Sequence, residues 1–461
     1  MSPRRLAVVG GGWAGLAAAV RATELGWQVS VFEAARSWGG RARALPATEA
    51  VDAVDAVDAV DAAPLDNGQH ILIGAYTATL GLMERLGVDL QAVLATLPLD
   101  LRYADGGGLA VPQRAARWPQ PLDLLAAIAC ARGWSWSERL ALLRASLGWR
   151  AAGFVCPPEL SVEQFCAGLP RRVIEELIEP LCLSALNTPL QRASAAVFLR
   201  VLSDALFGCG HGHWRGADLL LPRVDLGELL PGPALRWLES HGAPLHPGQR
   251  LEALQRSAAG WRLMGQDFDA VVLACPPREA ARLVRSGLAS GTPQDAQPGQ
   301  WVQQAEALGY EAIATVYARA VEPRTGQAAA LPGGSAMLGL RCGPLAPAQF
   351  VFDRGRLGGP QGLLAFVVSA SIAERAELER QVLAQGRAQL GLPRLELLRT
   401  VVEKRATFSC TPGLRRPAAA IMAGLRAAGD YVDGPYPATL EGAVRSGLQA
   451  AEALDQATPP R

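Results

Sequence analysis

The sequence predicts an α/β fold, and three observations support this prediction. Residues 6–19 run from an apolar strand through a glycine-rich turn into an alanine-rich helix, and residues 27–33 form a second apolar strand. Residues 156–200 are apolar with helical spacing, whereas residues 305–410 contain apolar runs that alternate as strands do. The first pattern is typical of a parallel sheet with a crossover helix, and the other two indicate a second part with both helices and strands.

The turn in LAVVGGGWAGLAAA has the glycine spacing of a dinucleotide-binding turn. Gly10 would make the tight turn, Gly12 would let backbone amides approach a pyrophosphate, and Gly15 would let the helix pack on the strand. The helix would direct its positive end at the diphosphate. Glu33 lies 18 residues after Gly15, where a carboxylate can accept hydrogen bonds from ribose hydroxyls. The pattern predicts a Rossmann-like domain, and a tight turn without a ligand is the alternative.

Composition excludes several classes of function. The 461 residues include 44 basic and 43 acidic side chains, so no overall field attracts nucleic acid. A hydrophobic content of 50% with only 19% charged residues indicates a greasy substrate or a membrane surface. The eight cysteines form no CxxC pair and no metal-ligand spacing with the histidines, so we expect no metal and a reducing cytoplasm. We also expect no signal peptide and no spanning helix.

A second glycine pair narrows the nucleotide to FAD. Gly39 and Gly40 allow another close backbone approach, and the planar guanidinium of Arg41 can meet diphosphate oxygens. Together with the first turn and Glu33, this GGR pattern resembles the flavin amine oxidase and phytoene desaturase superfamily. The resemblance implies an amine-oxidase-like fold, in which a discontinuous FAD-binding domain joins an α+β substrate domain with a mixed sheet and a helical cap. An ordinary solvated role for Arg41 is the alternative.

The stretch DNGQHILIGAY, residues 66–76, is the most particular motif. Its first three residues form a turn ahead of an apolar run, and a helical pattern follows. It resembles the hydroxysqualene dehydroxylase family, also called squalene-associated FAD-dependent desaturases, of bacterial hopanoid biosynthesis. The resemblance implies that backbone here lies against the flavin ring. His70 is our candidate proton donor, because histidine can deliver a proton near neutral pH, and capping of backbone is the alternative.

Residues 118–149 combine four tryptophans with leucines, alanines and arginines. Aromatic and basic side chains beside an apolar helical face suit the membrane interface. The same pattern also suits core packing or the wall of a substrate cavity, and the sequence leaves these interpretations open. Further along, we expect a hairpin at residues 99–112, a capping box beginning at Ser161, a strand around residues 250–254 and a hairpin of residues 261–264 with 269–274.

The C-terminal region contains the third cofactor element. An apolar segment leads to Gly429 and Asp430, whose carboxylate suits a ribityl hydroxyl, and the amides that open a helix near Glu441 would face the flavin pyrimidine. In the superfamily that the sequence resembles, the residue matching Leu251 contacts adenine through its backbone. The residues expected to contact FAD are Gly10, Gly12, Trp13, Ala14, Gly15, Glu33, Ala34, Gly39, Gly40, Arg41, Asn67, Gly68, Gln69, His70, Leu251, Gly429, Asp430, Ala438, Thr439 and Leu440.

These motifs divide the chain between two domains. The FAD-binding domain is expected to contain residues 1–75, 215–295 and 416–461, and the substrate domain residues 76–214 and 296–415. Residues 51–62 repeat Val-Asp-Ala four times, a period that suits neither a helix nor a strand, so we expect a low-complexity insert in a surface loop.

The family resemblance implies an enzyme that removes the hydroxyl of hydroxysqualene and forms squalene. Two alternatives remain: a phytoene or carotenoid desaturase, which transfers hydride in the opposite direction, and a non-catalytic escort protein that binds isoprenoids. A single dinucleotide motif predicts that a diffusing reductant, with NADPH as a candidate, supplies the electrons. We expect a cytoplasmic protein that contacts the inner face of the cell membrane peripherally, with an isoprenoid lipid as substrate.

Overall fold

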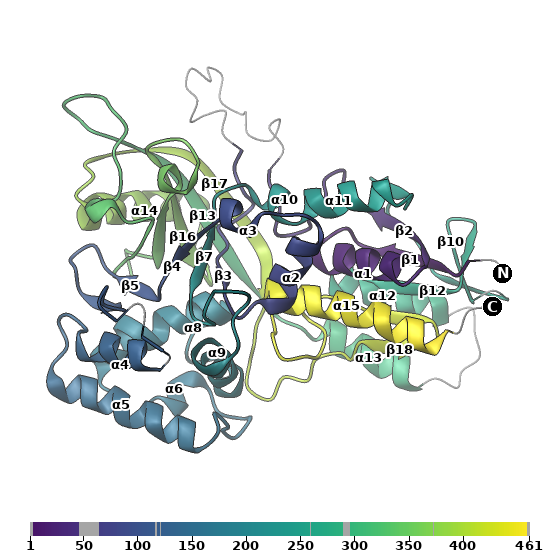
Figure 1. Cartoon of the computed structure of the whole chain (residues 1–461), viewed down its shortest axis with the longest axis horizontal. Helices are drawn as coiled ribbons and strands as arrows, with labels where there is room; N and C mark the ends of the chain where they lie inside the picture. Colours follow the sequence, from purple (N-terminus) through teal and green to yellow (C-terminus); the bar gives the residue numbers. More distant parts are fainter. Residues whose placement is uncertain are drawn as a thin grey trace.

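The computed structural model describes residues 3–45, 64–115, 118–119, 121–258, 260–288, 296–371 and 373–458. The Val-Asp-Ala repeat lies outside these ranges. Figure 1 shows one sheet with helices α1, α12 and α15 on the right, a second sheet at the upper left and helices α4, α5 and α6 at the lower left. The first and the last described residues lie together on the right, at the far side of the molecule from α5, and Arg4 forms an ion pair with Asp455 there.

Sheet I, the larger sheet, has six strands in the described part of the chain, in the order β18-β19-β12-β1-β2-β8. Strand β1 pairs in parallel with β2 and β12 and aligns Val8 with Val31 and Val272. These strands are apolar along their length because both faces of the sheet are covered. The strands are β1 (Arg5–Val9), β2 (Gln28–Glu33), β8 (Leu245–Pro247), β12 (Ala270–Leu273), β18 (Ala420–Met422) and β19 (Leu425–Ala427).

Helices α1 (Trp13–Glu24) and α15 (Leu440–Ala457) pack side by side against sheet I (Figure 1). Their close approach requires Gly447, since a Cβ added there would lie 2.1 Å from the carbonyl oxygen of Ala14. The same part of the molecule contains α10 (Leu226–Leu229), α11 (Pro231–Ser240), α12 (Pro277–Leu288) and α13 (Ala296–Glu306).

Two expectations for the stretch between residues 245 and 274 are wrong. Residues 250–254 are irregular; the strand that joins sheet I is β8, and Gly248, with φ of +72°, turns the chain away directly after it. The guanidinium of Arg282 then donates hydrogen bonds to the carbonyl oxygens of Leu251 and Glu252. The hairpin joins β10 (Gly260–Leu263) to β11 (Gln266–Phe268), whereas β12 continues into sheet I.

Sheet II, in the substrate region, has five described strands in the order β14-β15-β16-β13-β17. All its pairings are antiparallel, so the expected mixed character belongs to sheet I, where β18 runs antiparallel to β19. Helix α14 (Arg375–Leu390) packs on this sheet through Leu378 and Val382. The strands are β13 (Tyr310–Val321), β14 (Met337–Gly339), β15 (Phe350–Asp353), β16 (Leu363–Ser369) and β17 (Arg394–Phe408), with short 3-10 turns η3 (Pro332–Gly334) and η4 (Arg354–Leu357).

The helical cap, residues 122–207, lies below sheet II in Figure 1. The expected capping box is present: the Ser161 hydroxyl accepts from the amide of Gln164, whose side chain accepts from the amide of Ser161. Ser135 and Glu138 form a second one at the start of α5. The cap consists of α4 (Leu122–Ala129), α5 (Trp136–Ala151), α6 (Val162–Phe165), α7 (Arg171–Val173), the π-helical turn η2 (Ile174–Ile178), α8 (Glu179–Leu186) and α9 (Ala195–Phe207).

Short elements connect the cap to the two sheets. The hairpin expected at residues 99–112 is formed by two antiparallel strands, which pair Asp100 with Ala110. These elements are α2 (Thr77–Arg85), α3 (Leu90–Val93), β3 (Leu72–Ile73), β4 (Leu94–Leu97), β5 (Asp100–Arg102), β6 (Gly108–Ala110) and β7 (Leu219–Pro222). Strand β9 (Gln255–Ser257) instead pairs with β10 in a separate sheet.

Candidate active site

A single cavity of about 780 Å³ runs between sheet I, sheet II and the helical cap. At one end it is lined by the glycine turns and by the segments around residues 67–70 and 429–431. At the other end its walls are apolar side chains of the cap and of sheet II. The cavity therefore combines a polar end and an apolar end in one continuous space, the arrangement expected of a cofactor site joined to a lipid site.

The structure brings the sequence-predicted site residues together around this cavity. All of them line it except Gly15, which lies behind the turn. The lining residues from the prediction are Gly10, Gly12, Trp13, Ala14, Glu33, Ala34, Gly39, Gly40, Arg41, Asn67, Gly68, Gln69, His70, Leu251, Gly429, Asp430, Ala438, Thr439 and Leu440.

The turn requires glycine because backbone segments approach one another closely around it. Gly10 has φ of +113°, and a Cβ added there would lie 2.5 Å from the carbonyl oxygen of Ala274. A Cβ on Gly15 would lie 1.8 Å from the carbonyl oxygen of Gly10. Gly12 and Gly40 face one another, because a Cβ on Gly40 would come within 3.2 Å of the Gly12 Cα. Bulkier residues would therefore close the space in front of the turn.

The N-terminus of α1 opens on the cavity and suits an anion. Gly12 is its N-cap, so within the described residues no side chain caps it, and its first turn contains no acidic residue. The free amides of the first turn carry the positive end of a twelve-residue helix. A glycine cradle in front of an uncapped helix N-terminus fits a diphosphate.

Glu33 stands at the end of β2 and lines the cavity beside the turn. One carboxylate oxygen accepts from the amide of Gly11 at 2.6 Å and the other from the amide of Ala35 at 2.7 Å. These bonds fix the carboxylate in place. Each oxygen keeps a further lone pair, so Glu33 can still accept hydrogen bonds from a ribose.

Arg41 and Asp430 form an ion pair across the polar end of the cavity. The Nη2 atom of Arg41 lies 2.5 Å from Oδ1 of Asp430, and its Nη1 donates to the carbonyl of Ala406 at 2.7 Å. The sequence predicted separate contacts of these residues with the cofactor, and the structure shows that they also hold each other. The pair ties the first cofactor segment to the last one.

Two buried polar atoms at this end support the presence of a ligand. The hydroxyl of Tyr431 and Oε1 of Gln69 are inaccessible to solvent and have no hydrogen-bond partner among the described residues. Both residues line the cavity. Buried polar atoms are nearly always paired in native proteins, so these two atoms fit a cofactor that supplies the missing partners.

His70 is half-buried and lines the cavity. Its Nδ1 is 2.9 Å from the carbonyl oxygen of Gly68, which can only accept, so Nδ1 carries a hydrogen. Burial lowers the pKa of His70, and the nearby Arg41 charge lowers it further, while the bond to Gly68 opposes this change. The ring is therefore neutral at neutral pH, with Nε2 as a hydrogen-bond acceptor.

The apolar end is built mainly by α8 and α9. Because α9 crosses the cap with one side toward the cavity, its lining residues recur at helical spacing. Strands β15 and β16 of sheet II supply the opposite wall. The lining residues of this end are Leu181, Leu183, Phe198, Val201, Leu202, Ala205, Leu206, Phe350, Phe352 and Val367.

Sequence reasoning missed several polar residues of the cavity. Glu403 lines it and accepts from Nδ2 of Asn67 at 3.3 Å, yet it lies in the middle of a strand and no motif marks it. Arg282 and Glu279 reach the cavity from α12. Tyr431 could have been found, because it directly follows the Gly429–Asp430 pair.

Comparison with known proteins places this geometry in a family. The family described as flavin-containing amine oxidoreductases matches residues 13–455. A hydroxysqualene dehydroxylase of Rhodopseudomonas palustris is 28% identical over 96% of this chain and 97% of its own length. One of Sinorhizobium fredii is 27% identical over 98% of each chain. The crystal structure of an oxidoreductase from Methanosarcina mazei superposes with a TM-score of 0.67 at 15% identity, covering 97% of this chain and 100% of that one.

The fold and the cavity define an oxidoreductase that binds a flavin dinucleotide. The family match begins at Trp13, directly after the glycine turn and at the start of α1, and it ends at residue 455, within the last helix. This chain belongs to the family of flavin-containing amine oxidoreductases, and its cofactor is FAD. Among the described residues, no helix has the length and hydropathy needed to cross a membrane.

Proposed function

We propose that this protein reductively removes the hydroxyl of hydroxysqualene and releases squalene, as a step of hopanoid biosynthesis. The proposal takes its substrate from relatives that carry this activity in their names and that align over nearly the whole chain. The observation that carries it is the polarity of the cavity: polar groups gather at the cofactor end, and the walls beyond are apolar. Such a space suits a long hydrocarbon with one hydroxyl.

The residues assigned to FAD each have a physical reason for their role. The amides of Gly12 and of the first turn of α1 would hold the diphosphate, and Glu33 would accept from the adenosine ribose. Asp430 would accept from a ribityl hydroxyl while Arg41 keeps it in place. Thr439 caps α15 through the amide of Gly442, which leaves other amides of this terminus for the flavin pyrimidine.

Dehydroxylation needs a proton at the substrate oxygen and a hydride at the carbon. The hydroxyl of hydroxysqualene is allylic, so loss of water from the protonated alcohol leaves a delocalised cation. Bound FAD in its reduced form supplies the hydride. The apolar side chains of α8 and α9 keep water away from the cation. If water could reach it, the cation would add water and form the alcohol again.

His70 is the proposed proton donor because it lines the cavity and its Nδ1 bonds to the carbonyl of Gly68, so that Nε2 is the ring atom assigned to the substrate. In its neutral form Nε2 accepts a hydrogen bond from the substrate hydroxyl. When Nε2 has instead taken a proton from water, it can donate this additional proton to the hydroxyl oxygen, which then leaves as water. Burial lowers its pKa, so the protonated form becomes populated below the ordinary histidine range. We therefore expect the chemical step to accelerate as pH falls.

The reductant is proposed to diffuse to the flavin rather than to occupy a second fixed nucleotide site. The chain has one glycine turn of the dinucleotide type, and Gly10 and Gly12 belong to it. NADPH is the first donor to test, since it can transfer a hydride directly to a flavin.

The test uses purified holoenzyme, hydroxysqualene and either NADPH or dithionite under anaerobic conditions, with products identified by mass spectrometry. We expect squalene with one hydride incorporated from the reduced flavin for each hydroxyl lost as water. Unchanged hydroxysqualene together with desaturation of a polyene would overturn the proposal in favour of a desaturase. A preparation that binds the substrate, holds no flavin and makes no product would favour an escort protein.

A further inference from the structure

We propose that the outer side of helices α4 and α5 docks on a lipid bilayer that contains anionic headgroups. This surface, the docking face, consists of Trp118, Leu122, Leu125, Trp136, Leu140 and Leu147. Only the biological reason for this docking rests on the proposed function, because a hydrocarbon substrate resides in a bilayer. The contact itself is argued from exposure, spacing and charge.

Helix α5 is apolar on its solvent side as well as on its core side. Trp136 is 75% exposed, Leu140 45% and Leu147 56%, whereas Leu142, on the opposite side, is 3% exposed. The exposed residues are four and seven positions apart, so they form one stripe along the helix. Contiguous apolar stripes of this kind on a soluble surface mark interaction sites.

Helix α4 and the residues before it extend this stripe. In α4, Leu122 and Leu125 are three positions apart and are 48% and 39% exposed, and Trp118, which precedes the helix, is 48% exposed. Arg139 joins the two helices: its guanidinium stacks on Trp136 at 4.8 Å and donates to the carbonyl of Ala129 at the end of α4. Arg139 therefore holds the end of α4 beside the start of α5.

The charge of this region complements an anionic surface. Residues 121–156 contain four arginines and two acidic residues, in a chain whose net charge is only +1. One of the acids, Asp123, is buried and paired with Arg215, so it adds no negative charge to the surface. Arg139 stacks on Trp136 and Arg150 on Phe207, which places cations beside the apolar groups at headgroup depth.

The docking face leads toward the substrate cavity. At the end of α9, Phe207 is 42% exposed and its ring lies 5.5 Å from that of Phe154, which follows α5. The two residues directly before it, Ala205 and Leu206, line the apolar end of the cavity. A lipid-borne substrate would therefore meet the cavity at the edge of the contact with the bilayer.

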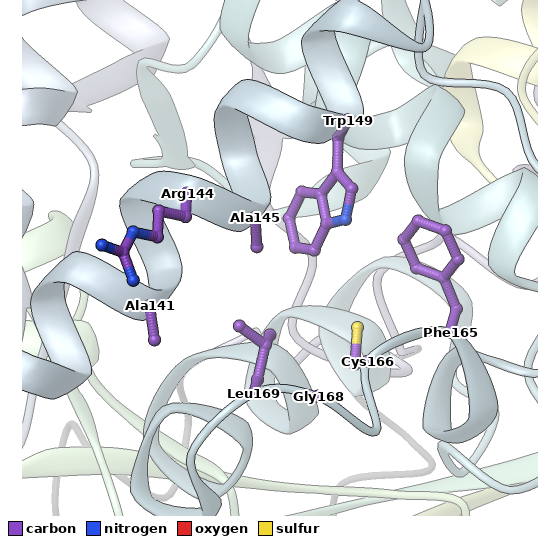
Figure 2. A pocket seen from close by; sticks show the side chains of 8 residues that line it. All are labelled: Ala141, Arg144, Ala145, Trp149, Phe165, Cys166, Gly168 and Leu169. Carbon is purple, nitrogen blue, oxygen red and sulfur yellow. The ribbon is translucent and has the colours of Figure 1, made fainter.

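A separate cleft of about 450 Å³ lies beneath α5 (Figure 2). Its walls include Trp149 and Ala145 from α5 and Phe165 and Leu169 from the segment that faces it. Arg144 is the one charged residue in its described lining, and Figure 2 shows the guanidinium apart from the aromatic rings. The cleft suits one acyl chain of a docked lipid, with Arg144 near its phosphate.

A second copy of this chain is the competing occupant. A two-fold contact through this surface would bring the same arginines of both copies together, and like charges facing one another oppose such a contact. The charge therefore favours the bilayer, and the oligomeric state becomes an outcome of the test.

The test measures binding of the holoenzyme to vesicles by sedimentation, with phosphatidylcholine alone and with added phosphatidylglycerol. We expect binding that needs the anionic lipid and weakens with salt. The triple variant W136S, L140S and L147S should lose it, and R144Q with R150Q should weaken it by about fivefold for each arginine. The matched control replaces exposed apolar residues elsewhere, as M264S, L345S and L397S, and should bind as the wild type does.

Flavin absorbance and the thermal midpoint check that each variant is folded, and light scattering reports its oligomeric state. The proposal is overturned if the wild type ignores anionic vesicles, if the control variant loses binding equally, or if the triple variant only converts a dimer to a monomer. Because vesicle binding is read without turnover, a failure of the docking face is distinct from a failure of the proposed activity. Hydroxysqualene in detergent should still be converted by the triple variant.

Discussion

The two ends of the cavity are built on different principles. Around the glycine turn, a single additional atom would clash with the backbone, because a Cβ on Gly15 would lie 1.8 Å from the carbonyl oxygen of Gly10. In the helical cap, Gly148 sits on α5 with open space, since no described atom beyond its near neighbours lies within 4 Å of an added Cβ. The cofactor end depends on particular residues at particular positions, whereas the cap depends on residues of the right class.

Replacing the same residue type in both regions gives the largest contrast. Gly15→Ala should force the turn apart at a cost on the order of 3 kcal/mol, which corresponds to roughly a hundredfold loss of FAD affinity. Gly148→Ala should stabilise the protein by about 0.5–1 kcal/mol, because alanine is the better helix former. Flavin absorbance of the purified proteins and their thermal midpoints measure both effects. Full FAD content in the Gly15 variant would contradict the assignment of this turn.

The sequence predicted the first region well because its geometry demands particular residues. Gly10, Gly12, Glu33, Gly39 and Asp430 were assigned from spacing and resemblance, and the structure gathers them around one cavity. The glycines are needed where one backbone segment approaches another, and the carboxylates are needed at fixed positions beside the cavity. Because only one residue type suits each of these positions, a single sequence is enough to recognise them.

The cap and the irregular segments were less predictable for a physical reason. An apolar helix has the same sequence pattern whether it faces a cavity, the protein core or a lipid. The pattern of residues 118–149 therefore left three interpretations open. The strand expected at residues 250–254 failed because the side chain of Arg282 replaces the strand pairing of that backbone. Glu403 was missed because it comes close to Asn67 only in the folded chain.

The two walls should also differ in their effect on catalysis. His70→Gln keeps a polar side chain but cannot carry the proton, so kcat should fall by about a hundredfold or more, and the acceleration at low pH should disappear. Ser184 lines the cap wall, but its hydroxyl donates to the carbonyl of Pro180 in its own helix. Ser184→Ala should therefore change kcat little. The measurement is the pH profile of single-turnover squalene formation, and an unchanged profile for H70Q would exclude His70 as the donor.

Each region also contains a buried carboxyl whose pKa is raised, and replacing either one should alter how stability depends on pH. Burial raises the pKa of Asp66 from an ordinary 3.8 to about 7, although the amide of Leu226 donates to it. Burial also raises the pKa of Glu179 at the start of α8, and the Glu175 carboxylate adds to this change. Asp66 is 4% exposed, while Glu179 remains half-buried and can relax toward water.

A raised pKa in the folded state means that folding favours the protonated form. The stabilising contribution of protonated Asp66 is complete below pH 3.8 and is lost as pH rises toward about 7. Asp66→Asn keeps an oxygen that can accept from Leu226 and has no charge to bury, so its stability relative to wild type should increase from pH 4 to pH 8 by a few kcal/mol at most. Glu179→Gln should show the same sign with a smaller amplitude. Thermal midpoints of the two holoenzyme variants and the wild type across this range decide the matter: equal slopes would mean that the cofactor loop is no more tightly sealed from water than the cap.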